Sequence, residues 1–217
     1  MIVDERVSCY IKSLTACNSN FLEELREKAL EDKVPIIKRE TESLLKTLLL
    51  LKKPKKILEV GTAVAYSSLV MAEVLEGKTK ISTIENYEKR VLEARKNIAD
   101  SNYSNTIHLI EEDASKVLKE LVEKKEKYDF IFMDAAKGQY INWLEPVIKL
   151  LNKEGVLCSD NVLQGGDIVQ SRYLIERRDR SIHSRLREYL YELTQREELS
   201  TTILSLGDGV ALTVLKK

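Results

Sequence analysis

The chain has 217 residues, and its 35 basic and 35 acidic side chains cancel. This length suits one domain with a large core, and the balanced charge gives no overall field that would indicate a nucleic-acid or membrane partner. No uncharged run approaches the roughly twenty residues of a membrane span, and the charged residues 4–6 argue against a signal peptide. We therefore expect a soluble, cytoplasmic protein without a membrane partner.

The N-terminal quarter of the chain has the pattern of amphipathic helices. Apolar residues recur at helical spacing over residues 3–16, 19–32 and 38–52. Pro35 separates the second helix from the third, and Pro54 ends the third. The leucine-rich faces of these helices favour a homodimer.

Strands and helices alternate five times after Pro54, which predicts a doubly wound parallel sheet. The expected strands are residues 56–60, 80–84, 106–110, 128–133 and 155–159, and the expected helices are residues 66–76, 87–100, 114–125 and 139–151. We expect an α/β fold whose core is a Rossmann-like, mostly parallel, seven-stranded sheet.

The C-terminal part completes the predicted sheet. A long charged helix is expected near residues 168–197, followed by strands at about 199–205 and 209–215. Gly207-Asp208-Gly209 between these strands indicates an antiparallel C-terminal hairpin. The whole chain, residues 1–217, is predicted to be one domain, with a helical N-terminal extension at 1–53 and a Rossmann-like core at 54–217.

Polar oxygen ligands follow two of the predicted strands. Asp134 ends the strand at 128–133, and Asp160-Asn161 ends the strand at 155–159. The carboxyl ends of parallel strands meet at one edge of a sheet, with neighbouring strands about 4.8 Å apart. Two carboxylates and an amide oxygen there predict a site for Mg²⁺ or another divalent cation. The alternative is that these residues only cap the following helices.

The turn after the first strand indicates a nucleotide-like ligand. Gly61 permits a sharp turn, but the other glycines of a dinucleotide fingerprint are missing, and no P-loop lysine follows. Ser67 begins the next helix, where free amides hold a carboxylate. Glu85 ends the second strand, where it can accept ribose hydroxyls or cap the next helix, and Glu112-Asp113-Ala114 ends the third. This order describes a pocket for a nucleoside that carries an amino acid.

With these residues the chain resembles the cation-dependent, class I S-adenosylmethionine O-methyltransferases, which include catechol and caffeoyl-CoA O-methyltransferases. The matching stretches are Val34–Ile37, Leu58–Thr62, Tyr66-Ser67, Glu85, Glu112–Ala114, Asp134–Lys137 and Asp160-Asn161. One departure is Ala65, where many relatives have glycine, and a methyl group there is tolerable if φ is negative.

The resemblance implies S-adenosylmethionine as the cofactor and assigns residues to its parts. Gly61, Ser67 and the Ile36 segment would hold the methionine end, Glu85 the ribose, and Ala114 would lie beside the adenine. The cofactor-binding residues implied in total are Ile36, Glu59, Gly61, Ser67, Glu85, Asp113, Ala114 and Asp134. Asp134, Asp160 and Asn161 would bind Mg²⁺.

The predicted chemistry is methyl transfer to a hydroxyl group. A divalent cation lowers the pKa of a hydroxyl beside it, and a second substrate oxygen completes a chelate. Lys137, three residues after Asp134, is the candidate general base, because a lysine near a cation in a partly dry pocket has a depressed pKa. The alternative is that Lys137 is a solvated loop residue.

The arginine-rich segment 172–187 bears on the substrate. Together with Asp-Asn-Val-Leu-x-x-Gly after the metal strand, it resembles bacterial tRNA 5-hydroxyuridine methyltransferases, which implies tRNA as the partner. Arg177, Arg178 and Arg180 are the candidate phosphate contacts, and the base would stack on Tyr140 or Trp143. The alternatives are a solvated helix face with an Arg172–Glu176 pair, and a Trp143 that belongs to the core.

Two other functions stay open at this point. One is O-methylation of a small catechol or caffeoyl-type phenol, which needs no arginine-rich face. The other is a module that binds S-adenosylmethionine without catalysis, which the presence of Asp134, Lys137, Asp160 and Asn161 argues against.

Overall fold

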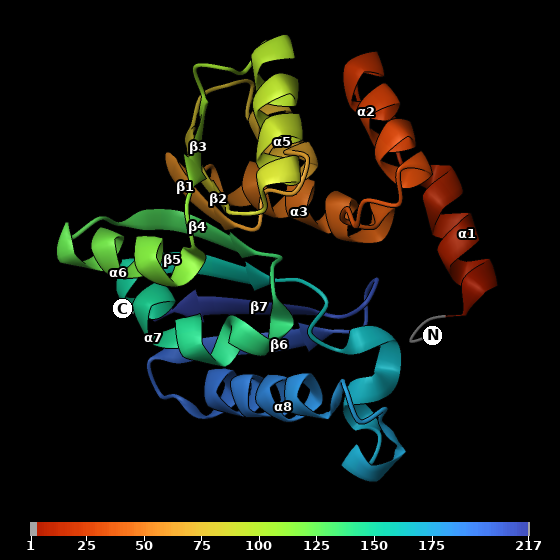
Figure 1. Ribbon diagram of the computed structural model, residues 1–217, viewed down its shortest axis with the longest axis vertical. Coiled ribbons are helices and arrows are strands. Elements are labelled where there is room, and N and C mark those ends of the chain that lie inside the picture. The colour runs from red at the N-terminus through yellow and green to blue at the C-terminus, as the bar shows by residue number, and fades with distance from the viewer. Residues whose placement is uncertain (1–3, 217) are drawn as a thin grey trace.

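The computed structural model describes residues 4–216, so residues 1–3 and 217, including the first residue of the helix expected at 3–16, lie outside the described residues (Figure 1). The predicted N-terminal helices are α1 (Glu5–Leu14), α2 (Asn20–Glu31) and α3 (Arg39–Lys52). The Asp4 carboxylate caps α1 by accepting from the Arg6 amide. Buried leucines of α2 and α3 join the core, whereas α1 buries none of its residues.

The seven predicted strands form one sheet with the strand order β3-β2-β1-β4-β5-β7-β6. They are β1 (Lys56–Val60), β2 (Lys80–Glu85), β3 (Ile107–Glu111), β4 (Tyr128–Met133), β5 (Leu151–Ser159), β6 (Leu199–Leu204) and β7 (Val210–Leu215). Strands β1 to β5 are parallel, and β7 runs antiparallel to both β5 and β6. The predicted fold class, including the C-terminal hairpin, is confirmed.

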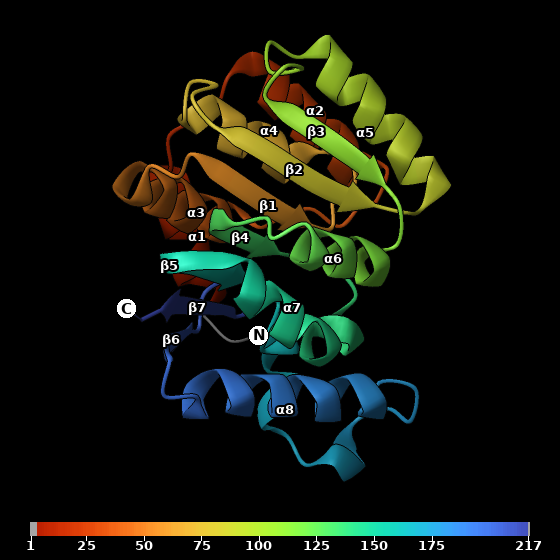
Figure 2. The same cartoon turned by 90° about the vertical axis from the view of Figure 1, so that its left-hand side faces the viewer.

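Helices cover both faces of the sheet, as Figures 1 and 2 show. The other helices are α4 (Tyr66–Val74), α5 (Glu88–Asp100), α6 (Ala114–Glu123), α7 (Tyr140–Leu150) and α8 (Arg180–Gln195). Alternate residues of β1 point to opposite faces of the sheet and join two separate hydrophobic cores. Ile57 belongs to the core shared with α2 to α5, and Leu58 belongs to the core shared with α6 to α8. Both faces of the parallel strands are therefore buried, which explains their continuous apolar runs.

The chain reverses its winding direction between β1 and β4, which are neighbours in the sheet. A crevice forms outside the carboxyl ends of the strands at such a point, and ligands of doubly wound folds bind there. The ends of β1, β2, β4 and β5 therefore bring the predicted site residues to one edge.

The expected long helix at 168–197 is wrong in its first third. Two short 3-10 helices, η2 (Gln164–Val169) and η3 (Arg172–Leu174), come first, and α8 begins only at Arg180. Within the expected range, Gln170, Ser171 and Ile175 have extended backbones with ψ values of 160°, 138° and 139°, which interrupt a helix. Ser171 accepts from the Tyr173 amide and starts η3 separately.

Strand β5 also differs from its prediction, since it begins at Leu151 and not at residue 155. Leu151 pairs with Tyr128, and the register then shifts before Val156 pairs with Phe130. The irregularity lets the polar residues 152–154 enter a strand, so the sequence pattern of alternation misses them. Among the described residues, no helix combines the length and apolar character that crossing a membrane requires.

Candidate active site at the carboxyl edge of the sheet

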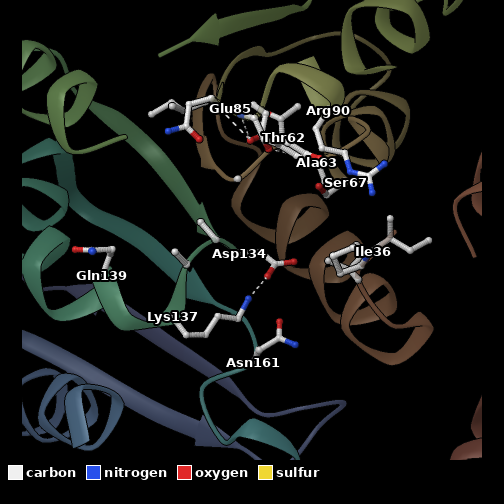
Figure 3. Close-up of a pocket in the computed structure, with 18 of the residues that line it drawn as sticks. Ile36, Thr62, Ala63, Ser67, Glu85, Arg90, Asp134, Lys137, Gln139 and Asn161 are labelled. Atoms are coloured by element: carbon white, nitrogen blue, oxygen red, sulfur yellow. Dashed lines mark hydrogen bonds and ion pairs between the residues drawn. The ribbon is translucent and has the colours of Figure 1, made fainter. Parts of the chain in front are cut away.

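A cavity of about 700 Å³ opens at this edge of the sheet. Its walls come from the segment before α3, the turn after β1, the ends of β2 and β4, and the start of α7 (Figure 3). The predicted site residues on its wall are Ile36, Gly61, Ser67, Glu85, Asp113, Asp134, Lys137 and Asn161. Segments that are distant in the sequence therefore share one cavity.

Gly61 lets the turn after β1 approach β4 closely. Its φ is +100°, and a Cβ atom at this position would lie 2.1 Å from the backbone oxygen of Asp134. The Gly61 and Thr62 amides both donate to the Ile84 oxygen, at 3.1 and 3.2 Å. A side chain at position 61 would therefore push apart the two strands that carry the site.

A methyl group at position 65 was expected to be tolerable only with a negative φ. The φ of Ala65 is +67°, so this condition is not met. A left-handed backbone costs a residue with a Cβ about 1–2 kcal/mol. Glycine would avoid that cost but would lose about 0.5–1 kcal/mol to chain entropy and about 0.8 kcal/mol from the buried methyl group. Ala65 is fully buried, so these contributions offset one another and explain why alanine is tolerated.

Glu85 is held by backbone amides on the cavity wall. Its Oε2 accepts from Ala63 at 2.9 Å, and its Oε1 accepts from Asn86 and Tyr87 at 3.0 Å each. The N-cap residue of α5 is Tyr87, so Glu85 is not the cap of this helix. Each carboxylate oxygen has a further lone pair, and Glu85 therefore presents a fixed acceptor to the cavity.

Another part of the cavity wall lies at the start of α6. Asp113 caps α6 by accepting from the Ser115 amide at 2.9 Å, and both residues line the cavity. Ser115 Oγ accepts from Trp143 Nε1 at 3.0 Å, which fixes the indole in the wall. Ala114, expected beside the adenine, is not among the lining residues of the described chain, and its neighbour Ser115 takes that place.

The aromatic residues proposed to stack on a base differ in their exposure. Tyr140 is fully buried, and its hydroxyl donates to the Met133 oxygen at 3.0 Å and accepts from the Ala135 amide at 3.2 Å. The prediction that Tyr140 offers a stacking face is therefore wrong. Trp143 is 5% exposed, so it belongs to the core and also contributes one edge to the cavity.

Asp134, Asp160 and Asn161 converge at the junction of β4 and β5. The Asp160 amide donates to the Met133 oxygen at 2.9 Å, so Asp160 lies alongside the end of β4. The Asn161 carboxamide places one terminal atom 3.1 Å from Asp134 Oδ1 and 3.3 Å from Asp160 Oδ2. Lys137 Nζ donates to Asp134 Oδ1 at 2.6 Å, as Figure 3 shows.

The electrostatics of this cluster fit a divalent cation. Burial and the neighbouring Asp134 charge raise the pKa of Asp160 above its usual range. A cation would offset this repulsion. Within residues 4–216 no three His, Cys, Asp or Glu side chains gather as a metal-binding group, so any site here has two carboxylates and an amide. Such a sparse oxygen set suits Mg²⁺, which keeps several waters.

Glu59 lies behind the cavity wall and not on it. It is fully buried, and it accepts hydrogen bonds from Ser68 and Thr83. Its Oε1 has no hydrogen-bond partner within the described part of the chain. Burial raises the pKa of Glu59 to about 7. Glu59 therefore holds the first turn of α4 through Ser68. It does not line the cavity that residues 4–216 form, although a direct cofactor contact was expected.

The arginine-rich segment mostly contacts its own loops. Arg180 donates to the backbone oxygens of Ile175 at 3.0 Å and Tyr173 at 3.3 Å. Arg178 pairs with Glu176 and Asp179 at 3.0 and 3.4 Å. The expected Arg172–Glu176 pair would need a helix that these residues do not form. Arg177, Arg178 and Arg180 do not line the cavity as far as the chain is described.

Arg90 is a cavity residue that the sequence did not indicate. Its side chain is 16% exposed and pairs with Glu93 at 2.6 Å. Figure 3 shows its guanidinium projecting to the same end of the cavity as Ser67. In the sequence Arg90 is one of many charged residues on an exposed helix, so only the packing of α5 against the β1–α4 turn identifies it. Gln139 also lines the cavity and was not predicted.

Comparison with known proteins identifies the family. Residues 12–217 match the O-methyltransferase family. A flavonoid 3',5'-methyltransferase of Vitis vinifera is 33% identical over 172 residues, covering 76% of this chain and 72% of that protein. A caffeoyl-CoA O-methyltransferase of Citrus natsudaidai is 31% identical over 171 residues, covering 73% and 70%. A Staphylococcus aureus structure assigned as a caffeoyl-CoA O-methyltransferase superimposes with a TM-score of 0.89 at 31% identity, covering 97% and 100% of the two chains. The chain therefore belongs to the O-methyltransferase family, among the S-adenosylmethionine-dependent enzymes of the caffeoyl-CoA type.

Proposed function

We propose that this protein transfers a methyl group from S-adenosylmethionine to a hydroxyl of a catechol-type or caffeoyl-type phenol, with the help of a divalent cation. The observation that carries the proposal is that one cavity joins Glu85 and Asp113 to Asp134, Lys137 and Asn161. Residues suited to a nucleoside cofactor therefore lie next to the oxygen cluster. The relatives named as flavonoid and caffeoyl-CoA methyltransferases support a phenol as the acceptor.

The cofactor would lie along the wall from α6 to α4. Asp113, Ser115 and Trp143 form the end suited to adenine, and Glu85 is placed for the ribose hydroxyls. At the other end, Ser67 and Arg90 offer a hydroxyl and a guanidinium to the α-carboxylate of the methionine part. These residues would thus hold the cofactor at both ends and in the middle.

The reaction requires a deprotonated hydroxyl and an aligned methyl group. When bound, the cofactor supplies an electrophilic methyl group and the cation lowers the pKa of the acceptor hydroxyl. In its neutral form Lys137 would accept the hydroxyl proton at Nζ and still donate an N–H to Asp134, 2.6 Å away, which orients the amine. The cavity would bring the two reactants close together, which lowers the entropic part of the barrier.

The tRNA substrate stays a prediction, and the phenol is the better supported acceptor. Arg178 and Arg180 are already engaged by groups of this chain. A deciding experiment measures transfer from methyl-labelled cofactor to catechol and, separately, to tRNA that lacks 5-methoxyuridine. We expect methylated catechol and no dependence on the charges of Arg177 and Arg178. Label in tRNA with none in catechol would overturn the phenol proposal.

The cation dependence is tested with Asp160→Ala. We expect catechol methylation to be lost in this variant and in excess chelator, because one charged ligand or the ion itself is removed. Binding of S-adenosylhomocysteine, measured by calorimetry, should stay nearly unchanged, because Asp160 is not on the cavity wall formed by the described residues. Full activity in excess chelator would contradict the proposed cation dependence.

A further inference from the structure

Asp208 stands in the turn between β6 and β7 and packs against the loop that follows Asn161. Its backbone oxygen accepts from the Leu163 amide at 3.0 Å, and the Gly209 oxygen accepts from Val162 at 3.0 Å. Gly209 has a φ of +94°, and a Cβ atom there would lie 2.3 Å from Leu163 Cγ. The turn is therefore held close to the oxygen cluster by contacts that a bulkier residue would break.

The Asp208 carboxylate bridges two parts of the site. Its Oδ1 accepts from Lys38 Nζ at 2.7 Å, and its Oδ2 lies 3.4 Å from Asn161 Nδ2, a long hydrogen bond. The Asp208 side chain is 28% exposed. Lys38 directly follows the segment that places Ile36 on the cavity wall. Asp208 thus contacts both the cofactor-side segment and a residue of the oxygen cluster.

The Asn161 carboxamide has two orientations with opposite consequences. In one, the amide nitrogen faces Asp134 and Asp160, at 3.1 and 3.3 Å, and donates to both carboxylates. The amide oxygen then faces the Asp208 carboxylate, so two acceptors oppose each other. In the other orientation the oxygen faces Asp134 and Asp160, and the nitrogen donates to Asp208. Only this second orientation presents three oxygens to a cation.

We propose that Asp208 is a positioning residue that selects the cation-competent orientation of Asn161. It repels the Asn161 oxygen in the first orientation and accepts from the nitrogen in the second, so it lowers the cost of presenting the oxygen inward. Lys38 pairs with the other Asp208 oxygen, Oδ1, and so does not compete with Asn161 for Oδ2. The inference rests on the proposed cation dependence and adds a residue outside the oxygen cluster itself. Groups that orient metal ligands typically change metal affinity by about 10–100-fold when removed.

The test measures binding of Mn²⁺ by electron paramagnetic resonance, with S-adenosylhomocysteine present. We expect Asp208→Ala to weaken Mn²⁺ binding by about tenfold, and Asp208→Asn to weaken it clearly less, because the Asn side-chain oxygen still accepts from Asn161. Equal losses in the two variants would show that only the Asp208 charge matters and would overturn the positioning role. Far-UV circular dichroism and the affinity for S-adenosylhomocysteine establish that each variant is folded.

A second background separates orientation from charge more sharply. In Asn161→Asp the two terminal atoms are equivalent oxygens, so there is no orientation to select. Adding Asp208→Ala to this variant should weaken Mn²⁺ binding clearly less than it does in the wild-type background, because only the through-space attraction of the Asp208 charge is lost. The same tenfold loss in this background would overturn the inference.

A control variant tests the contact of the other Asp208 oxygen, Oδ1, with Lys38. Lys38→Met removes the partner of Oδ1 while Oδ2 still faces Asn161, and we expect its Mn²⁺ affinity to match wild type within about twofold, a change small beside the effects of ligand-orienting groups. A loss as large as that of Asp208→Ala would show that the ion pair, and not the contact to Asn161, is responsible. If the wild-type protein binds no Mn²⁺, the cation proposal fails and this inference with it. If wild type binds Mn²⁺ and Asp208→Ala binds it equally well, only the inference fails.

Discussion

At the scale of single residues, Glu85 tests the cofactor assignment directly. Three backbone amides hold its carboxylate in place, so the charge is already oriented before a ligand arrives. Glu85→Gln keeps an acceptor but removes the charge, and charge-assisted hydrogen bonds are roughly twice as strong as neutral ones. We expect calorimetry to show at least about tenfold weaker S-adenosylhomocysteine binding. Glu88→Gln, on the exposed side of α5, is the control and should bind as wild type does.

A second prediction concerns Arg90, and its expected effect on affinity differs between two ligands. If its guanidinium binds the α-carboxylate, Arg90→Met should weaken S-adenosylhomocysteine about tenfold or more. Methylthioadenosine lacks this carboxylate, so its affinity should hardly change. A general disturbance of α5 would weaken both ligands alike, because both contain adenosine. Calorimetric titration of the two ligands therefore distinguishes a carboxylate contact from a structural role.

At the scale of elements, Arg180 stabilises the segment between β5 and α8. The two hydrogen bonds from Arg180 to backbone oxygens join η3 to the start of α8. Arg180→Met should lower the free energy of unfolding by about 1–2 kcal/mol, since hydrogen bonds from charged groups are worth more than neutral ones. Exposed Arg177→Met should change it by less than about 0.5 kcal/mol. Urea unfolding of the two variants measures the difference, and equal values would contradict this role.

At the scale of the whole molecule, the predicted homodimer stays a prediction, and the structure changes the helix that would carry it. Leu22, Leu25, Leu45 and Leu49 are buried in this chain's own core. In contrast, α1 exposes Tyr10 and Leu14 by 66% and 67%. If α1 forms the interface, wild type should sediment as a dimer and Leu14→Glu as a monomer. Leu51→Glu, at a position on α3 that is 77% exposed, should not change the mass, and a monomeric wild type would contradict the prediction.

The fold and much of the site follow from local patterns in the sequence. The apolar runs before Asp134 and Asp160 mark buried parallel strands, and parallel strands bring their carboxyl ends to one edge. The convergence of Asp134, Asp160 and Asn161 is therefore predictable from order and spacing alone. Glu85 and Asp113 are predictable for the same reason, since each lies at or just after the end of a strand. Ser67 is predictable because it lies in the first turn of the helix after Gly61.

Other features depend on contacts between distant segments, and only the tertiary structure decides them. Ala65 has a positive φ in the turn after β1, although alanine itself disfavours that conformation. Arg90 and Asp208 acquire their places because α5 and the β6–β7 turn pack against loops far away in sequence. Charge patterns alone do not separate an arginine that binds a ligand from one that binds a backbone oxygen, as Arg180 shows. The sequence by itself determined the sheet and the residues at its edge, because strand periodicity is local. The tertiary structure decided which charged side chains face the cavity, because that depends on packing between elements.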